Sequence, residues 1–180
     1  MRLFATRGFD RVTVAQIAAE AGVSEKTVFN YFPTKEDIFF DEVPERLRAL
    51  TEAIRDRPAG MTVLESLKQK QLAEAPRLTS PGFAGFARIL EDSPALQAKE
   101  VDVMARFSQV LADALQEDGL EERDARIVAG LLMSVHRQFF RAARHQALAG
   151  KTGPAALRQL EADIARSYEL LEHGLGAAVG

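Results

Sequence analysis

The sequence contains no cysteine and no tryptophan, and it has only three histidines among 180 residues. Without cysteine the chain cannot form disulfide bonds, zinc–thiolate sites or a cysteine nucleophile. No uninterrupted apolar run approaches the roughly 18 residues of a membrane-spanning helix, and the first residues lack the apolar stretch of a signal peptide. These absences predict a soluble protein of the cytoplasm with no membrane partner.

Sequence motifs of enzymes are also lacking. The histidines His136, His145 and His173 are not spaced as a metal-binding pair on one helix, and no His-Glu-x-x-His run occurs. A Gly-x-Ser-x-Gly elbow and a glycine-rich phosphate loop are absent as well. We therefore predict a protein that is not an enzyme and that uses no metal or cofactor. An enzyme is the weaker alternative.

Apolar residues make up 47% of the chain, which is enough for a buried core. They recur with helical spacing, and isoleucine and valine never alternate over a useful strand length. Glycine and proline punctuation predicts an all-α protein of about nine helices. The expected helices are 1–7, 14–21, 25–32, a longer one from 35, and helices near 62–75, 82–92, 94–117, 121–148 and 154–174. Pro44 should kink or break the fourth helix.

Residues 13–32 have the pattern of a helix, a tight turn and a second helix. Thr13 and Gln16 form a capping-box pair at the start of the first helix, and Ser24 caps the second. Gly22 can adopt the positive φ that the turn needs. The small residue Ala18 allows the helices to cross closely, and apolar side chains are expected to converge there: Ile17, Val23 and Val28. The pattern predicts a helix-turn-helix, with a helical hairpin of no DNA role as the alternative.

The segment from Arg7 to Phe40 resembles the DNA-binding domain of TetR-family regulators. The resemblance rests on these marks: Arg7-Gly8-Phe9, Val12-Thr13-Val14, Ile17-Ala18, Ala21-Gly22-Val23-Ser24, Thr27-Val28-Phe29, Tyr31-Phe32 and Lys35-Glu36. The remainder resembles the family only in its helical layout. Phe29 stands where the family usually has tyrosine. The first helix is shorter than usual, which suggests a misassigned start or a trimmed sequence.

Two further stretches resemble an actinobacterial subgroup that includes mycofactocin-cluster regulators. They are Val28 to Asp37 and Glu91 to Leu96. The family resemblance as a whole implies a homodimeric repressor that binds a palindromic operator in double-stranded DNA and is released by a small-molecule effector.

The second helix of the motif should place its exposed face in the major groove. Lys26 can donate to guanine, Asn30 can pair with adenine, and Glu25 can accept from cytosine, although Glu25 fits a solvated or capping role equally well. Hydroxyl and ammonium groups suited to phosphate are found at Thr13, Thr27, Tyr31 and Lys35. Residues 1–35 carry five basic and three acidic residues, whereas the remainder carries 18 and 23. The positive charge is therefore local, as expected if one end of the chain contacts phosphate.

We expect an N-terminal three-helix helix-turn-helix domain over 1–46 and a helical effector-binding and dimerisation domain over 47–180. The predicted effector pocket is lined by Phe83, Phe86, Met104, Phe107, His136 and Phe140. Such an apolar lining favours a lipophilic effector. The alternative is that these residues, His136 included, only pack the core.

The last two helices are the predicted dimer interface, because two helices from each subunit can form a four-helix bundle. The expected contact residues are Gly130, Leu160, Ile164, Tyr168 and Leu171, with Leu175 beyond them. The alternative is that these stripes face only the core of one chain. A helical interaction module that has lost DNA binding is the second rival function.

Overall fold

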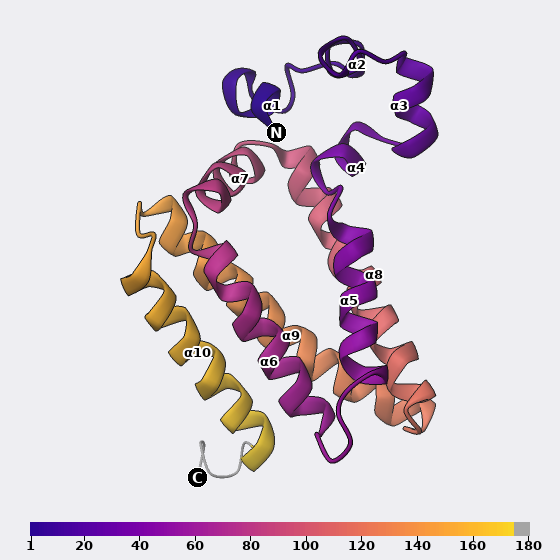
Figure 1. The fold of residues 1–180 in the computed structure, drawn as a ribbon, viewed down its shortest axis with the longest axis vertical. Coiled ribbons are helices and arrows are strands. Elements are labelled where there is room, and N and C mark those ends of the chain that lie inside the picture. Colours follow the sequence, from indigo (N-terminus) through magenta and orange to yellow (C-terminus); the bar gives the residue numbers. More distant parts are fainter. Residues whose placement is uncertain (175–180) are drawn as a thin grey trace.

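The computed structural model describes residues 1–174, and these form ten helices and no strand. Figure 1 shows the helices α1 (Arg2–Arg7), α2 (Val14–Ala21), α3 (Glu25–Tyr31), α4 (Lys35–Phe39), α5 (Val43–Arg55), α6 (Val63–Leu78), α7 (Pro81–Glu91), α8 (Pro94–Glu117), α9 (Glu122–Leu148) and α10 (Pro154–His173). The prediction of an all-α protein is confirmed.

Hydroxyl side chains define where most of these helices begin. Thr13, Thr34 and Thr62 each accept a hydrogen bond from the backbone N–H three residues on, and each forms a complete capping box. Ser24, Ser80 and Ser93 accept in the same way at the starts of α3, α7 and α8. These caps satisfy N–H groups that have no partner inside the helix, so the polar punctuation of the sequence sets the helix starts.

Two prolines account for the differences from the expected helices. The long fourth helix is broken into α4 and α5. Pro44 lies in the first turn of α5, where a backbone N–H would have no acceptor within the helix, so its missing N–H costs no hydrogen bond. This break gives ten helices instead of nine. Pro76 does not end α6 at residue 75, because the helix continues to Leu78. The Thr79 hydroxyl donates to the carbonyls of Ala75 and Pro76, at 3.1 and 3.2 Å, and closes that last turn.

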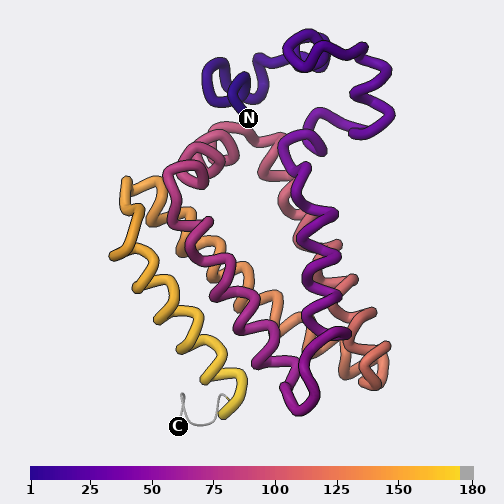
Figure 2. Tube along the Cα trace, viewed as in Figure 1, coloured from indigo at the N-terminus to yellow at the C-terminus, as the bar shows by residue number. Residues whose placement is uncertain are grey.

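The helices divide into a head and a body (Figure 1). The head, formed by α1 to α4, contains the N-terminus and lies at one end of the molecule. The body consists of α5 to α10, with α7 lying across the end that faces the head. Figure 2 shows α5, α6, α8, α9 and α10 running along the body away from the head. Within the body α8 packs against α9 and α5, and α10 packs against α6 and α9.

An aromatic cluster joins the head to the body. Phe4, Phe9 and Phe39 of the head are buried together, and Phe39 stacks on Phe86 of α7 with ring centroids 4.5 Å apart. Their small core cluster also includes Ile89, Leu90 and Leu96 from α7 and α8. The head therefore shares its core with the body. The boundary expected at residue 46 falls inside α5, whose first turns pack in the core of the body.

Two polar contacts reinforce this joint. The Ser93 hydroxyl, at the start of α8, donates to Asp10 at 2.8 Å. Lys99 of α8 forms an ion pair with Asp37 of α4, with 2.7 Å between Nζ and Oδ1. Burial raises the pKa of Asp37, but the hydrogen bonds from Lys99 and Thr34 outweigh it, so the pKa is lowered overall. Asp37 is therefore held as a carboxylate that fixes α4 against α8.

In the part of the chain that the structure describes, none of the helices has the length and apolar character needed to cross a membrane. Over the same residues, histidine, aspartate and glutamate side chains form no group of three that is able to hold a metal ion.

Candidate nucleic-acid interface and effector cavity

The α2–α3 unit has the geometry of a helix-turn-helix. Gly22 adopts a left-handed conformation with φ of 68°, and the N–H of Val23 donates to the carbonyl of Ala18 at 3.0 Å. Ala18 and Val28 are buried where the helices cross, as the residue types predict. Val23 is a correction, since its side chain is 43% exposed on the turn instead of buried in the crossing.

The outer face of α3 presents three polar side chains to solvent. Glu25, Lys26 and Asn30 are all exposed. Within residues 1–174 none of the three makes a side-chain hydrogen bond or an ion pair, whereas the Ser24 and Thr27 hydroxyls are paired at 2.8 Å. The donors and acceptors on this face are therefore available to an external partner, at the end of the molecule furthest from α10 (Figure 1).

The four residues expected at phosphates differ in their surroundings. Tyr31 is 78% exposed. Thr13 accepts from the Gln16 N–H at 3.3 Å, and Thr27 is paired with Ser24, so both hydroxyls already take part in caps. A hydroxyl keeps further hydrogen-bonding capacity after accepting one bond. The capping role does not use up these groups.

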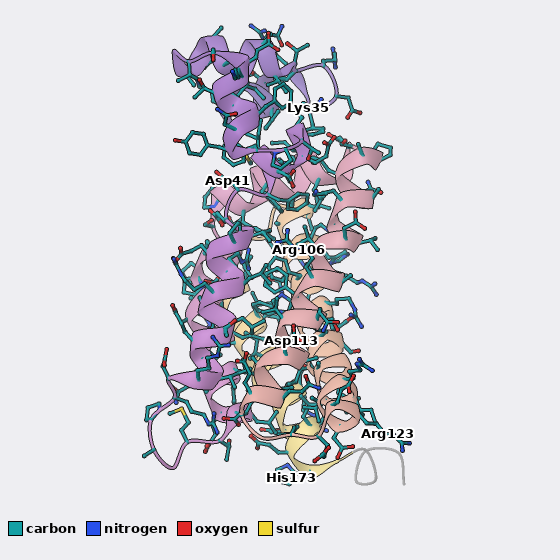
Figure 3. The ribbon with its side chains drawn as sticks, turned by 90° about the vertical axis from the view of Figure 1, so that its right-hand side faces the viewer. Lys35, Asp41, Arg106, Asp113, Arg123 and His173 are labelled. Atoms are coloured by element: carbon teal, nitrogen blue, oxygen red, sulfur yellow. The ribbon has the colours of Figure 1, made fainter. Side chains whose placement is uncertain are left out.

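Lys35 has a structural role that sequence reasoning missed. Its ammonium donates to the carbonyls of Phe9 and Val12, at 3.0 and 3.1 Å, and lies 4.2 Å from the centroid of the Phe9 ring. Figure 3 shows Lys35 within the head, above Asp41, which lies between α4 and α5. Two of its three donors thus hold the segment between α1 and α2 against α4. This role depends on the backbone carbonyls of Phe9 and Val12, which are far from Lys35 in the sequence and could not be predicted from it.

A cavity of about 310 Å³ lies in the body among α5, α6, α8, α9 and α10. Most of its lining is apolar, with Leu67, Leu111, Leu132 and Met133 around the sides. Of the six residues predicted for an effector pocket, only Phe107 and His136 line it.

The other four predicted pocket residues face elsewhere. Phe83 and Phe86 line a crevice of about 270 Å³ beside the head, and Met104 and Phe140 line a groove of about 510 Å³ between α8 and α9. For the three phenylalanines the reason is aromatic packing, because Phe83 stacks on Phe86 at 5.8 Å and meets Phe140 edge to face at 6.3 Å. Residue type alone did not show which side of each helix faces the cavity.

Apart from His136, the polar side chains of the cavity come from residues that the sequence did not single out. The Arg46 guanidinium lies 4.8 Å from the Phe140 ring centroid, and its Nη2 is 3.5 Å from a Glu74 carboxylate oxygen. Gln71 Nε2 is 3.4 Å from His136 Nδ1, whereas Gln71 Oε1 is buried without a partner. Charged residues on helices with a polar face are usually solvated, which is why sequence reasoning passed over them.

Burial sets the ionisation of the two basic groups. It lowers the pKa of His136 to about 4, and the charges of Arg46 and Arg137 act in the same direction. Burial also lowers the pKa of Arg46 to about 10, aided by the Arg77 charge and opposed by Glu74 and Glu42. At neutral pH the cavity therefore contains a neutral imidazole beside a positively charged guanidinium.

The residues expected at a dimer interface are mostly internal. Leu160, Ile164 and Tyr168 are buried in the core of the single chain, which corrects their assignment to a partner surface. The apolar stripe of α10 faces α6 and α9, and Tyr168 also lines the cavity. Leu171 is half-buried against the same core and Gly130 is half-buried on α9. Leu175 lies outside the described residues.

Replacing Lys35 by methionine should destabilise the fold. The substitution removes the donor from two partly buried carbonyls, so we expect the free energy of unfolding to fall by about 1–3 kcal/mol. Lys26→Met is the matched control, because Lys26 is exposed and should change stability by less than about 0.5 kcal/mol. Urea denaturation measures both, and equal stability of the two variants would contradict the role of Lys35.

His136 should make stability depend on pH. Its pKa in the folded protein, about 4, lies below the unfolded value near 6.5, so its contribution is complete above pH 6.5 and is lost as pH falls toward 4. Between pH 8 and pH 5 the loss amounts to about 2 kcal/mol. We expect His136→Asn and His136→Phe each to flatten the curve of unfolding free energy against pH relative to the unsubstituted protein. Parallel curves for all three would show that His136 is not buried as a neutral group.

Comparison with known proteins places this architecture among bacterial regulators. Residues 1–41 match the family described as bacterial regulatory proteins, tetR family. Nucleoid occlusion factor SlmA of Haemophilus influenzae is 30% identical over 156 residues, which cover 79% of this chain and 70% of that protein. The HTH-type transcriptional regulator TcmR of Streptomyces glaucescens is 28% identical over 130 residues, covering 72% of this chain and 55% of TcmR.

A solved structure extends the likeness to the body. The fatty acid degradation regulator FadR from Bacillus halodurans has the same fold, with a TM-score of 0.58 over 97% of this chain and 94% of that one, at 20% identity. The likeness thus includes both the head and the helices around the cavity. With its helix-turn-helix, its matching N-terminal segment and its relatives, the chain belongs to the tetR family of bacterial DNA-binding regulators.

Proposed function

We propose that the protein is a ligand-responsive repressor that binds a palindromic operator as a homodimer and is released by a small, lipophilic effector. The main support is one juxtaposition within the chain. An unengaged polar face on α3 lies in the head, an apolar-lined cavity lies in the body, and α5 extends from the head joint to that cavity. This arrangement supports the proposal, because a polar surface suited to DNA and a space suited to a ligand lie on connected elements.

On the DNA side, α3 inserts into the major groove with its polar face toward the bases. Asn30 pairs with adenine, Lys26 donates to guanine and Glu25 accepts from cytosine. The backbone contacts come from Thr13, Thr27, Tyr31 and Lys35, of which Lys35 has one donor left for a phosphate. Phosphate contacts position the head and base contacts select the sequence.

A palindromic operator requires two heads related by a twofold axis. The outer face of α9 offers the apolar surface for such a pairing, since Ile127 and Leu131 are 54% and 50% exposed on either side of Gly130. In the proposed dimer, α9 and α10 of each chain form a four-helix bundle around this face. The dimer contacts thus come from exposed residues of α9, while the buried stripe of α10 supports the helix from within.

The effector acts through α5. Ala49 and Leu50 of this helix line the cavity, and its first turn follows α4, which is fixed to α7 by the stacking of Phe39 on Phe86. A ligand that binds one position of α5 better than another shifts the head by that difference in affinity. A coupling of about 1–3 kcal/mol changes operator affinity about 5- to 150-fold.

The base contacts can be tested on an operator selected from a genomic DNA library. We expect Asn30→Ala to weaken binding to that operator by about 1–3 kcal/mol and to relax the preference at an adenine position. Tyr31→Phe removes only a hydroxyl suited to phosphate, so it should weaken binding to all sequences alike. Fluorescence anisotropy at several salt concentrations measures both effects. If no DNA is selected, the protein is an interaction module and not a repressor.

The dimer can be tested by placing a charge on α9. Leu131→Glu should shift the protein from dimer to monomer, because a carboxylate would be buried in the four-helix bundle without a partner. Val23→Glu is the control, since Val23 is also an exposed apolar residue, at 43%, but lies on the α2–α3 turn of the head and not on α9. Sedimentation velocity over a range of concentrations reports the mass. A dimer that survives Leu131→Glu would exclude this face.

A further inference from the structure

Arg46 is a largely buried cation with unused hydrogen-bonding capacity. A guanidinium has five N–H donors in a fixed planar fork. Within residues 1–174, Arg46 donates no hydrogen bond, and its one ion pair, with Glu74, is long at 3.5 Å. Arginine and carboxylate normally meet at about 2.7–2.9 Å, often through two parallel bonds. The Arg46–Glu74 contact therefore leaves the N–H donors of the guanidinium without a hydrogen-bond acceptor among the described residues.

The carboxylates near Arg46 are also engaged elsewhere. Glu74 lies 3.3 Å from Arg77, which in turn is 3.6 Å from Glu42. Glu45, which also lines the cavity, forms an ion pair with Arg48. Glu74 is thus shared between two arginines.

Arg46, His136 and Gln71 all line the cavity, and a chain of contacts connects them. The Arg46 guanidinium lies over Phe140, the Phe140 ring is 5.0 Å from the His136 ring, and His136 contacts the amide of Gln71. This amide has one buried atom without a partner, and its orientation can reverse by rotation of the terminal torsion. A reversed amide would accept from His136 Nδ1–H and would have an N–H free to donate.

We propose that the effector is a monocarboxylate with an apolar body, whose carboxylate is bound by Arg46 in place of Glu74. The reoriented Gln71 amide supplies a further donor, and the apolar body lies against Leu111, Leu132 and Met133. A carboxylate has the two acceptor oxygens that match the N–H donors left unused by the long Arg46–Glu74 contact. A phosphate dianion would bring a second charge close to Glu45 and Glu74, so a carboxylate is the better match.

The size of the cavity limits the ligand. An apolar cavity of about 150 Å³ binds benzene, so the 310 Å³ correspond to an effector of about ten to fifteen heavy atoms. This inference rests on the proposed function only in that the cavity binds an effector. Binding of a carboxylate can be measured on the protein alone, without DNA.

The test uses acids and their neutral isosteres. Decanoate and 4-phenylbutanoate have apolar bodies of different shape, and each is compared with its own primary amide by titration calorimetry. We expect at least one acid to bind at least tenfold more tightly than its amide, because a charge-assisted hydrogen bond is stronger than a neutral one. Equal binding of acid and amide, no binding of either acid, or tighter binding of decyl phosphate than of decanoate overturns the proposal.

Substitutions then test the roles of the residues. Arg46→Gln should weaken binding of the acid about ten- to a hundredfold and leave the amide nearly unaffected. Lys70→Gln is the matched control, since Lys70 is a second cation that lines the cavity but forms no ion pair with Glu74 within residues 1–174. If Lys70→Gln removes the preference for the acid and Arg46→Gln does not, the assignment of Arg46 is wrong.

Glu74→Gln gives an effect in the opposite direction. Removal of the competing carboxylate should tighten acid binding several-fold without tightening the amide, which a merely structural role would not produce. This variant also keeps the proposal testable if Arg46→Gln fails to fold, as judged by its thermal melting. Weaker acid binding by Glu74→Gln overturns the competition. A protein that binds the acids but selects no DNA would instead refute the repressor while leaving this inference standing.

Discussion

The stacking of Phe39 on Phe86 fixes the position of the head on the body. The α2–α3 unit buries little of its own, chiefly Ala18 and Val28, and a unit of this size rarely supports itself on so small a core. Its stability therefore comes from the shared aromatic cluster and from Lys35, which ties the α1–α2 segment to α4. These contacts with α7 and α8 hold the head against the body.

Because the head depends on the body for its core, the helix that connects the two, α5, is central to the structure. Its N-terminal end follows directly from α4, and its middle lines the cavity, so the same helix contacts both the joint and the ligand space. Pro44 in its first turn fixes where the helix begins without the loss of any hydrogen bond. The chain between α4 and α5 is therefore a turn over residues 40–42 and not a kink within one helix.

The local features of the fold could be predicted from the sequence because they depend on neighbouring residues. The capping hydroxyls Thr13 and Ser24 and the left-handed Gly22 act over three or four positions. The break near Pro44 also has a local cause, the missing N–H of proline. Pro76 is the instructive exception, since the buried Leu78 and the Thr79 hydroxyl extend the helix past it.

The cavity could be predicted only in part, for a different physical reason. Helical periodicity shows which face is apolar, but not which neighbour covers it. Leu160 and Ile164 were therefore assigned to a partner although they pack inside the chain. Phe83 and Phe86 were assigned to the pocket although they serve the joint. The polar face of α3 was easier to anticipate, because a short helix with few apolar positions leaves its remaining positions exposed.

Arg46 lines both the cavity in the body and the crevice beside the head, which is also lined by Phe39, Phe86 and Arg77. Any ligand charge that draws the guanidinium toward the cavity leaves Glu74 to Arg77 alone and alters the field at the α4–α5 turn. Burial already raises the pKa of Asp41 at this turn, and the Glu42 charge adds to the effect. Electrostatics at the base of α5 thus offers a direct physical route from the cavity to the position of the head.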